Sequence, residues 1–426
     1  MSDDRATSRR MNRRTFLRRA GGAAIAAPTL SAVLAACSKP GASNVVSGGS
    51  TNLLTTPARP DHPVTLPLWE DPIASSTPIE MNATLQVYNW TDYLWPKLFK
   101  KFEDQYSKYG TTVQLTTFND IDEGIQKMSS GQVAADVFFP DPSELTKLAV
   151  SKLVKPLNHD LLPNLAANYW PEFQNPFYDQ HWHYSVPYTI YTTGIAYRRD
   201  HIQDSEVHDR SNPYDILWDP KYRGKVTIYD DRRETIGMAL LKNGIKDVNT
   251  EDPKVIDMAR DDILKLIAAT NAQLTINGIY SKMPQDEFWV GSSWSGDIVS
   301  AFEYYLPKGT PPSVLGYWYP KDGGGMIGND LMVIPTSAKN PRLAHEFLNF
   351  MLNESNSYSN FTVFNGYQTP MTSINPSTLV PKVIPNNLAE AIVVPSYFDS
   401  GSFLLGISPT GEQLWNAAWD QIKAGG

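Results

Sequence analysis

Cysteine is almost absent from this sequence. Cys37 is the only cysteine among 426 residues, so the chain cannot form an internal disulfide. Long apolar runs are also missing: after residue 37, no stretch is long and apolar enough to span a bilayer. With 41% hydrophobic residues, the rest of the chain can instead build a large buried core and, by its length, two or three domains.

Metal and nucleotide motifs are missing as well. The seven histidines are scattered, and the one close pair, His181 and His183, lacks a nearby cysteine or a helical His-Glu spacing. The glycines at 323–325 are not followed by the Lys-Ser/Thr of a phosphate loop, so they indicate a turn. We expect no metal and no cofactor.

Catalytic motifs give little support for an enzyme. The sequence GSSWSG at 291–296 misses the Gly-x-Ser-x-Gly nucleophile elbow by one position. Paired acids such as Asp230 and Asp231 are compatible with glycosidase chemistry, so an anchored, secreted hydrolase stays an alternative. Acids at the ends of loops also suit ammonium binding without further assumptions, and we expect a protein that is not an enzyme.

The N-terminus has the pattern of an export signal. Paired arginines at 13–14 and 18–19 precede an apolar run from residue 20 to 34, which resembles a twin-arginine signal. The sequence LAAC at 34–37 is similar to the lipobox of bacterial lipoproteins, which makes Cys37 the predicted lipidation site. Residues 1–37 are therefore predicted to direct export and to anchor the protein on the outer face of the cell membrane.

Acidic residues outnumber basic ones. The formal charge is −8, and a mature chain that starts at Cys37 loses seven arginines and two aspartates, which leaves −13. This balance disfavours nucleic acid as a partner and is compatible with a cationic ligand. Residues 38–82 are rich in Ser, Gly, Pro, Thr and Asn without a sustained period, so we expect a flexible tether there.

The stretch 87–93 (VYNWTDY) joins a strand to a helix. Period-two alternation predicts a strand at 84–90, and apolar residues every fourth position predict a helix at 94–109. Trp90 and Tyr93 offer aromatic faces to a cation, and Asp92 offers a carboxylate for an ammonium group. Asp92 would equally serve as a helix N-cap, and the two aromatic side chains as core residues.

Strands and helices alternate along the next part of the chain. Strands are predicted at 112–118 and 135–139, and helices at 120–130 and 143–152, which is typical of a parallel sheet covered by helices. The loop after the third strand, residues 140–143, carries Asp141, and Ser143 is a good N-cap for the helix that follows. Because ligands bind outside the carboxyl ends of strands in such sheets, this loop is a candidate ligand site.

Carboxylates follow strands in the second half too. A β-rich stretch at 185–197 precedes a strand at 226–229 that ends in DDRRE at 230–234, followed by a helix from about 235 to 243. After a helix at 253–270, a further strand ends in WSGD at 294–297. Amphipathic helices are predicted after Pro341 and at 413–422.

Five motifs occur in one order: YNW at 88–90, WDPKYRG at 218–224, DDRRE at 230–234, WSGD at 294–297, and Asp330 followed by Ile-Pro. Together they make the chain resemble the spermidine/putrescine-binding proteins of bacterial ABC importers over about residues 84 to 426. The resemblance implies an α/β, two-lobed fold like that of the type II periplasmic binding proteins, with a polyamine in the cleft between the lobes.

The resemblance also implies lobe boundaries and contacts. Residues 83–193 and 298–353 form the expected first lobe, and residues 194–297 and 354–426 the second. The ligand contacts that it implies are Trp90, Asp92, Tyr93, Asp231, Glu234, Trp294, Asp297 and Asp330. Asp141 joins the expected contacts because of its place in the loop after the third strand. Expected partners are a membrane permease and an ATPase, with the binding protein itself a monomer that closes around its ligand.

The chain departs from the family pattern at several positions. Asn329 stands where an aromatic residue commonly precedes the acid, Ile190 replaces a common aromatic residue, and the segment 141–143 differs as well. These departures leave the particular amine open, with spermidine or putrescine expected first, and another small cationic or polar solute as the alternative. An anchored sensor built on the same fold is a further hypothesis.

Overall fold

A computed structural model describes residues 50–165 and 169–425, all of which belong to one compact unit, residues 45–426. The predicted export signal at 1–37, with the lipidation site Cys37, and the first part of the predicted tether lie outside the described residues.

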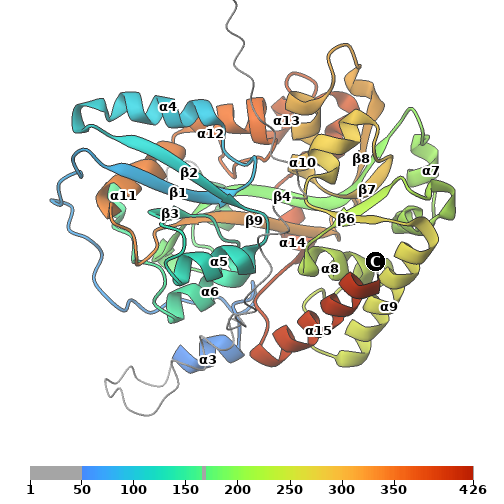
Figure 1. The fold of residues 1–426 in the computed structure, drawn as a ribbon, viewed down its shortest axis with the longest axis horizontal. Helices are drawn as coiled ribbons and strands as arrows, with labels where there is room; N and C mark the ends of the chain where they lie inside the picture. Colours follow the sequence, from blue (N-terminus) through green and yellow to red (C-terminus); the bar gives the residue numbers. More distant parts are fainter. Residues whose placement is uncertain (1–49, 166–168, 426) are drawn as a thin grey trace, which may run out of the picture. The chain divides into compact units, whose positions relative to one another are not determined.

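The described chain is organised around one ten-stranded mixed sheet (Figure 1). Its strands follow the order β2-β1-β3-β9-β4-β7-β5-β6, with β8 paired to β4 and β10 paired to β9. Their bounds are β1 (Thr84–Trp90), β2 (Thr112–Phe118), β3 (Val137–Phe138), β4 (Ser185–Arg198), β5 (Val226–Tyr229), β6 (Gln273–Thr275), β7 (Val290–Trp294), β8 (Leu315–Trp318), β9 (Met326–Val333) and β10 (Ser402–Phe403).

The centre of the sheet corrects the prediction of a parallel sheet. β1 runs parallel to β2 and β3, as predicted, and β5 runs parallel to β7 and to β6, a short strand that was not predicted. The long strands β4 and β9 instead run antiparallel to each other, and they join the two parallel ends. Strand-helix alternation therefore predicts the strand directions correctly only at the two ends of the sheet. A parallel neighbour needs a crossover connection, usually a helix, and the segment before β4 contains only short 3-10 turns.

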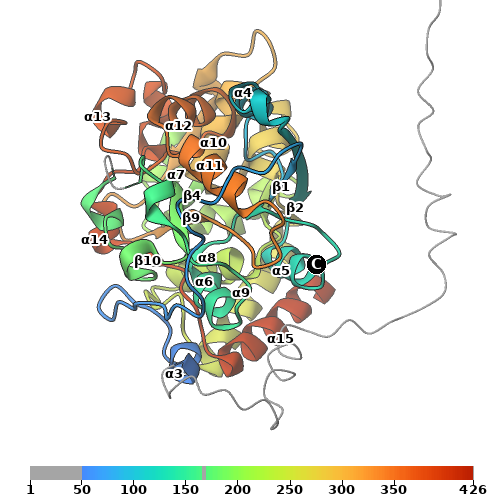
Figure 2. The same cartoon turned by 90° about the vertical axis from the view of Figure 1, so that its left-hand side faces the viewer.

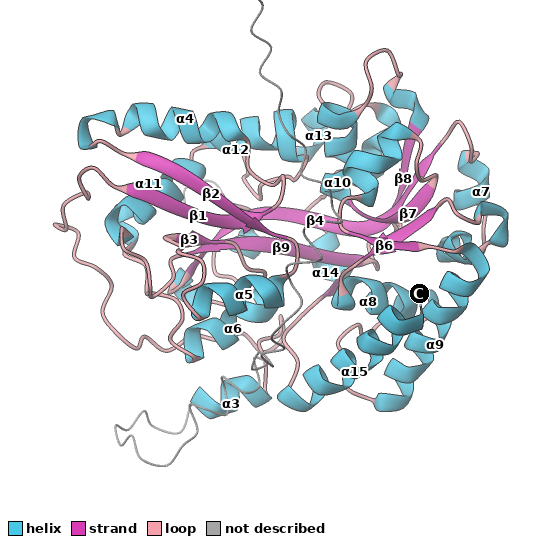
Figure 3. Ribbon diagram, in the orientation of Figure 1, coloured by secondary structure: helices cyan, strands magenta, loops and turns pink. Residues whose placement is uncertain are grey.

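Helices lie on both faces of the sheet (Figure 3). In this view α4, α10 and α12 lie above the strands, and α5, α6, α8 and α9 lie below them. The longer helices are α4 (Pro96–Gln105), α5 (Ile121–Ser129), α6 (Pro142–Val150), α8 (Arg232–Lys242), α9 (Pro253–Thr270), α11 (Pro341–Met351) and α15 (Pro409–Gly425). The shorter ones are α3 (Ser50–Thr55), α7 (Asp204–His208), α10 (Ser295–Ser300), α12 (Glu354–Asn360), α13 (Pro376–Leu379) and α14 (Tyr397–Ser400).

Two clusters of buried apolar side chains form the core. The first contains residues of β1, β3, α4 and α11, and the second contains residues of β5, α8, α9 and α15. The helices α9 and α15 lie side by side in both views (Figures 1 and 2). Most of the buried apolar residues between 361 and 393 belong to the first cluster, although the sequence assigns them to the second lobe. The lobe boundaries themselves stay a prediction.

The predicted tether is wrong for residues 56–82, which we call the strap (the blue segment of Figure 1). The backbone of Val64 exchanges hydrogen bonds with Phe177 and Gln180, at 2.8 and 3.0 Å. The indole of Trp69 donates to the carbonyl of Val154 at 3.0 Å. Composition alone missed this because three apolar side chains of the strap, Ala58, Val64 and Leu66, are buried and help to fix an otherwise polar segment.

Candidate functional site

A pocket with a cavity volume of about 120 Å³ lies where the strands β1, β5 and β7 end, beside residues of the central strands β4 and β9. All nine residues that the sequence predicts as ligand contacts line it: Trp90, Asp92, Tyr93, Asp141, Asp231, Glu234, Trp294, Asp297 and Asp330. Residues distant in the sequence therefore meet at one place, as expected for loops that follow neighbouring strands.

The loop after β1 presents Asp92 to the pocket without a capping role. Helix α4 begins at Pro96, its N-cap is Trp95, and no side chain caps it, so the alternative of Asp92 as an N-cap is wrong. The backbone of Asp92 has φ of 57°, a left-handed conformation that aspartate tolerates better than most residues. Its exposed carboxylate lies 3.4 Å from the hydroxyl of Tyr280, at the edge of the site.

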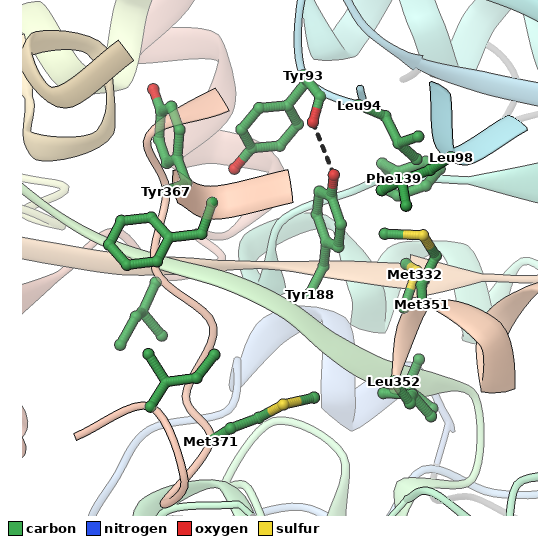
Figure 4. Close-up of a cluster of buried hydrophobic side chains, with 14 of the residues drawn as sticks. Tyr93, Leu94, Leu98, Phe139, Tyr188, Met332, Met351, Leu352, Tyr367 and Met371 are labelled. Carbon is green, nitrogen blue, oxygen red and sulfur yellow. Dashed lines mark hydrogen bonds between the residues drawn. The ribbon is translucent and has the colours of Figure 1, made fainter. Parts of the chain in front are cut away.

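Tyr93 links this loop to β9. Its hydroxyl donates to Asp330 at 2.5 Å and lies 2.5 Å from the hydroxyl of Thr189. The backbone carbonyl of Tyr93 accepts a hydrogen bond from the hydroxyl of Tyr188 at 2.7 Å, the dashed line in Figure 4. The ring meets those of Tyr188 and Tyr367 edge to face, so Tyr93 is both a core aromatic residue and part of the pocket wall.

Asp297 is held by two phenols. Tyr229 and Tyr367 each donate to one of its oxygens at 2.7 Å. Tyr367 reaches this position because residue 296 is glycine: a Cβ there would lie 2.2 Å from the ring. Burial raises the pKa of Asp297 to about 7 although both hydrogen bonds act to lower it.

Asp231 and Asp141 cap helices. The carboxylate of Asp231 accepts from the backbone N–H of Glu234 at 2.9 Å, so α8 begins three residues earlier than predicted. Asp141 accepts from the N–H of Ser143 at 2.7 Å, and Asp141, not Ser143 as predicted, is the N-cap of α6. Both aspartates remain partly exposed to the pocket, so each retains a face for a ligand.

The other acids of the pocket are more deeply buried. The exposed fractions are 4% for Glu234 and 7% for Asp330, and Glu234 accepts a hydrogen bond from Thr193 at 2.9 Å. Burial raises the pKa of each to about 8, and the neighbouring charges of Asp231 on Glu234 and of Asp141 on Asp330 act in the same direction. Burial also raises the pKa of Asp141 and of Asp231.

Two arginines line the pocket, but both interact with residues other than the six predicted acids. Arg232 pairs with Glu412 at 2.9 Å, and Arg233 donates to the carbonyl of Leu405 at 3.0 Å while stacking on Trp415. Seven carboxylates line the pocket, and one of them, Glu144, pairs with Lys147 at 3.0 Å. Within residues 50–165 and 169–425, none of the other six, which are the predicted ligand contacts, forms an ion pair with a basic side chain.

Aromatic rings cover the walls. The ring of Trp294 stacks on that of Tyr229 with centroids 3.9 Å apart, and its indole N–H is buried without a partner in the described structure. Trp90 lies 4.6 Å from Phe118, and its N–H donates to the carbonyl of Phe139 at 3.0 Å. Electron-rich faces beside unpaired carboxylates form a site suited to alkylammonium groups.

Several pocket residues were not predicted: Tyr191, Thr193, Tyr280, Asn365 and Tyr367. Tyr191 and Thr193 occupy alternate positions of β4, so the period of this strand combined with a known pocket face would have identified them. Asn329, singled out as a departure, does line the pocket, and its amide donates to the hydroxyl of Tyr178 at 3.0 Å.

A metal site or a membrane span finds no support in the part of the chain that the structure describes. No group of three or more His, Cys, Asp or Glu side chains there is arranged to hold a metal ion. Likewise, no described helix is long and apolar enough to cross a membrane.

Comparison with known proteins agrees with this site. The sequence profile of the bacterial extracellular solute-binding proteins matches residues 97–385. The chain belongs to this family. It is 29% identical to spermidine/putrescine-binding periplasmic protein 1 of Haemophilus influenzae over 71% of this chain and 79% of that one. It is 30% identical to the spermidine/putrescine-binding periplasmic protein of Escherichia coli over 64% of this chain and 73% of that one.

Solved structures extend the family match to the fold. The spermidine/putrescine ABC transporter substrate-binding protein of Streptococcus pneumoniae is 25% identical, with a TM-score of 0.62 over 80% of this chain and 99% of that one. The predicted fold class is confirmed: the chain has the α/β, two-lobed fold of type II periplasmic binding proteins.

Proposed function

We propose that this protein captures a polyamine and delivers it to the permease of an ABC importer. The observation that carries the proposal is the pocket itself, in which the six carboxylates predicted as ligand contacts meet several aromatic rings, and none of the six forms an ion pair within the described residues. Relatives named for spermidine and putrescine support the same class of ligand. A polyamine supplies what the pocket lacks, because it carries positive charge at both ends and methylenes between them.

The arrangement suggests how the ligand is held. One ammonium group would meet Asp297, and another would meet Asp330 and Glu234, which line the same pocket. The methylenes between them would lie against Trp294 and Trp90. Each ammonium would then gain charge-assisted hydrogen bonds that offset its loss of hydration.

Binding would be coupled to lobe closure. Lys147 of α6 pairs with Glu412 of α15 at 2.5 Å, and Arg232 of α8 lies 3.7 Å from Asp122 of α5. These ion pairs join helices that follow β2 and β3 to helices of the second core cluster, next to the pocket. A ligand that contacts both sides favours the state in which such contacts exist and shifts the population toward it.

Delivery requires partners and a location. We propose lipid attachment through Cys37 on the outer face of the cell membrane, a permease and an ATPase as partners, a monomeric binding protein, and no catalytic activity. If the closed form reports to a signalling partner instead, the same binding would serve sensing. Stimulation of ATP hydrolysis by the reconstituted permease and ATPase separates the two roles, because a sensor would leave it unchanged.

A thermal-shift panel tests the ligand class. The exported body is mixed with putrescine, cadaverine, spermidine, spermine, amino acids, sugars and ferric ion. We expect a di- or triamine to raise the melting temperature most, because ligand binding adds to the free energy of unfolding. Stabilisation by a sugar or by ferric ion, with no effect of any amine, would overturn the proposal.

A further inference from the structure

Tyr191 lies in the middle of the pocket, on a strand that crosses it. In the pairing of β4 with β9, Tyr191 stands opposite Gly328, and both residues line the pocket. A Cβ at position 328 would lie 2.7 Å from the Cζ and the hydroxyl oxygen of Tyr191. The ring therefore lies on the backbone of β9, in space that only a glycine leaves free.

The surroundings of this ring are acidic and aromatic. Its centroid lies 6.1 Å from that of Trp294 and 6.0 Å from that of Tyr367, both edge to face. Burial raises the pKa of the phenol well above its usual value, and nearby carboxylates raise it further. These are Asp330, Glu234, Asp141 and Asp231, from three different parts of the chain.

Its hydroxyl differs from those of the other tyrosines in the pocket. Tyr93, Tyr280 and Tyr367 each donate to an aspartate. For the Tyr191 hydroxyl, by contrast, there is no hydrogen bond to any residue in the described ranges, although four carboxylates are near enough to raise its pKa. The phenol thus occupies part of the pocket without a hydrogen bond to any of these acids, and it remains able to accept a hydrogen bond from an ammonium group.

We propose that Tyr191 is a specificity-determining residue that sets the length of the bound amine. The inference rests on the proposed function. The ring takes up space near the four acids, so this part of the pocket accommodates one ammonium group. A longer amine, which would place a second ammonium group next to the first, is excluded. Gly328 acts as a positioning residue, because it lets the ring lie flat on β9.

Calorimetric titrations with putrescine, cadaverine, spermidine and spermine test this assignment. In Tyr191→Ala the affinity for spermidine relative to putrescine is expected to rise about tenfold or more, since the fit of a few methylenes in a closed pocket has effects of that size. Tyr191→Phe keeps the ring and is expected to keep the ratio. Tyr304→Ala removes an exposed tyrosine that does not line the pocket and serves as the matched control.

A second variant tests the same inference if Tyr191→Ala fails to fold. Gly328→Ala leaves Tyr191 in the chain but forces its ring to move, so it should change the ratio in the same direction and have little further effect when combined with Tyr191→Ala. An unchanged ratio in both single variants would overturn the inference while the proposed function stands. If no amine binds the parent protein, the proposed function itself fails.

Discussion

Two groups of charged side chains lie next to each other in this protein, and they are composed differently. The balanced cluster contains Asp122, Glu144, Lys147, Arg232 and Glu412, in which Lys147 pairs with Glu144 and Glu412, and Arg232 pairs with Glu412 and Asp122. The acidic cluster contains Asp141, Asp231, Glu234, Asp297 and Asp330, and none of them has a basic partner within the described ranges.

This difference separates structural charge from functional charge. Burying a carboxylate is costly unless a cation or a proton compensates it. The chain supplies the cations of the balanced cluster, and there the pKa of Lys147 is raised, its two glutamate partners outweighing the opposing effect of burial, while the pKa of Glu412 is lowered by Lys147 and Arg232 against burial. In the acidic cluster, burial raises the pKa of every member. Protons therefore compensate part of the buried negative charge until a cationic ligand binds.

The largest effect is expected from removing an acid that has no replacement. Asp297→Asn leaves one ammonium group of the ligand buried without its charge partner, which costs about 3 kcal/mol or more and lowers amine affinity about 100-fold. Calorimetric titration with the amine that stabilises the parent most gives the change. Asp104→Asn, at an exposed position on α4, is the control and should bind like the parent. Parent-like affinity in Asp297→Asn would remove this residue from the site.

Proton release on binding tests the raised pKa values directly. With pKa values of about 7 for Asp297 and about 8 for Glu234 and Asp330, the free pocket holds protons at pH 7 that an ammonium displaces. Affinity should therefore rise from about pH 6 to about pH 8.5, by up to roughly tenfold per pH unit for each proton released. Titrations in buffers of different ionisation enthalpy count these protons, and a count of zero would contradict the charge assignment.

The same groups give the opposite trend for the ligand-free protein. Their pKa values are higher folded than unfolded, so the folded state binds more protons than the unfolded state between about pH 4 and the folded pKa. Stability without amine should fall as pH rises through this window, and saturating amine should reduce the fall. Melting temperatures at pH 5.5 and 8.5, each with and without amine, show whether the trend exists.

A smaller effect is expected from the balanced cluster. Glu412→Gln removes one of the two acidic partners of Lys147 and of Arg232, which should disfavour the closed state by about 1 to 2 kcal/mol and lower amine affinity about tenfold. Lys147→Met combined with Glu412→Leu removes charges of both signs and should recover part of the loss. Small-angle scattering with saturating amine should show a larger radius of gyration for Glu412→Gln than for the parent.

The sequence predicted most of the acidic cluster and little of the balanced one. Strand period and acids at strand ends locate Asp141, Asp231 and Asp297, because such loops must meet at one edge of a sheet. The partners of Glu412 were not predictable, since an amphipathic helix indicates its buried face and not the helices that it will meet. Tyr191 was missed for a related reason: its role depends on a glycine of a neighbouring strand.

Composition did not predict that the strap packs against the body, and a variant at this contact has the smallest expected effect. In Tyr184 the hydroxyl donates to the carbonyl of Pro67 at 2.7 Å and lies 3.3 Å from the backbone N–H of Trp69. Tyr184→Phe loses these contacts and should lower the free energy of unfolding by about 1 kcal/mol. Because the strap contributes no residue to either cluster, amine affinity and proton release should stay unchanged. Denaturant unfolding and titration of one preparation measure both, and weaker amine binding would mean that the strap communicates with the pocket.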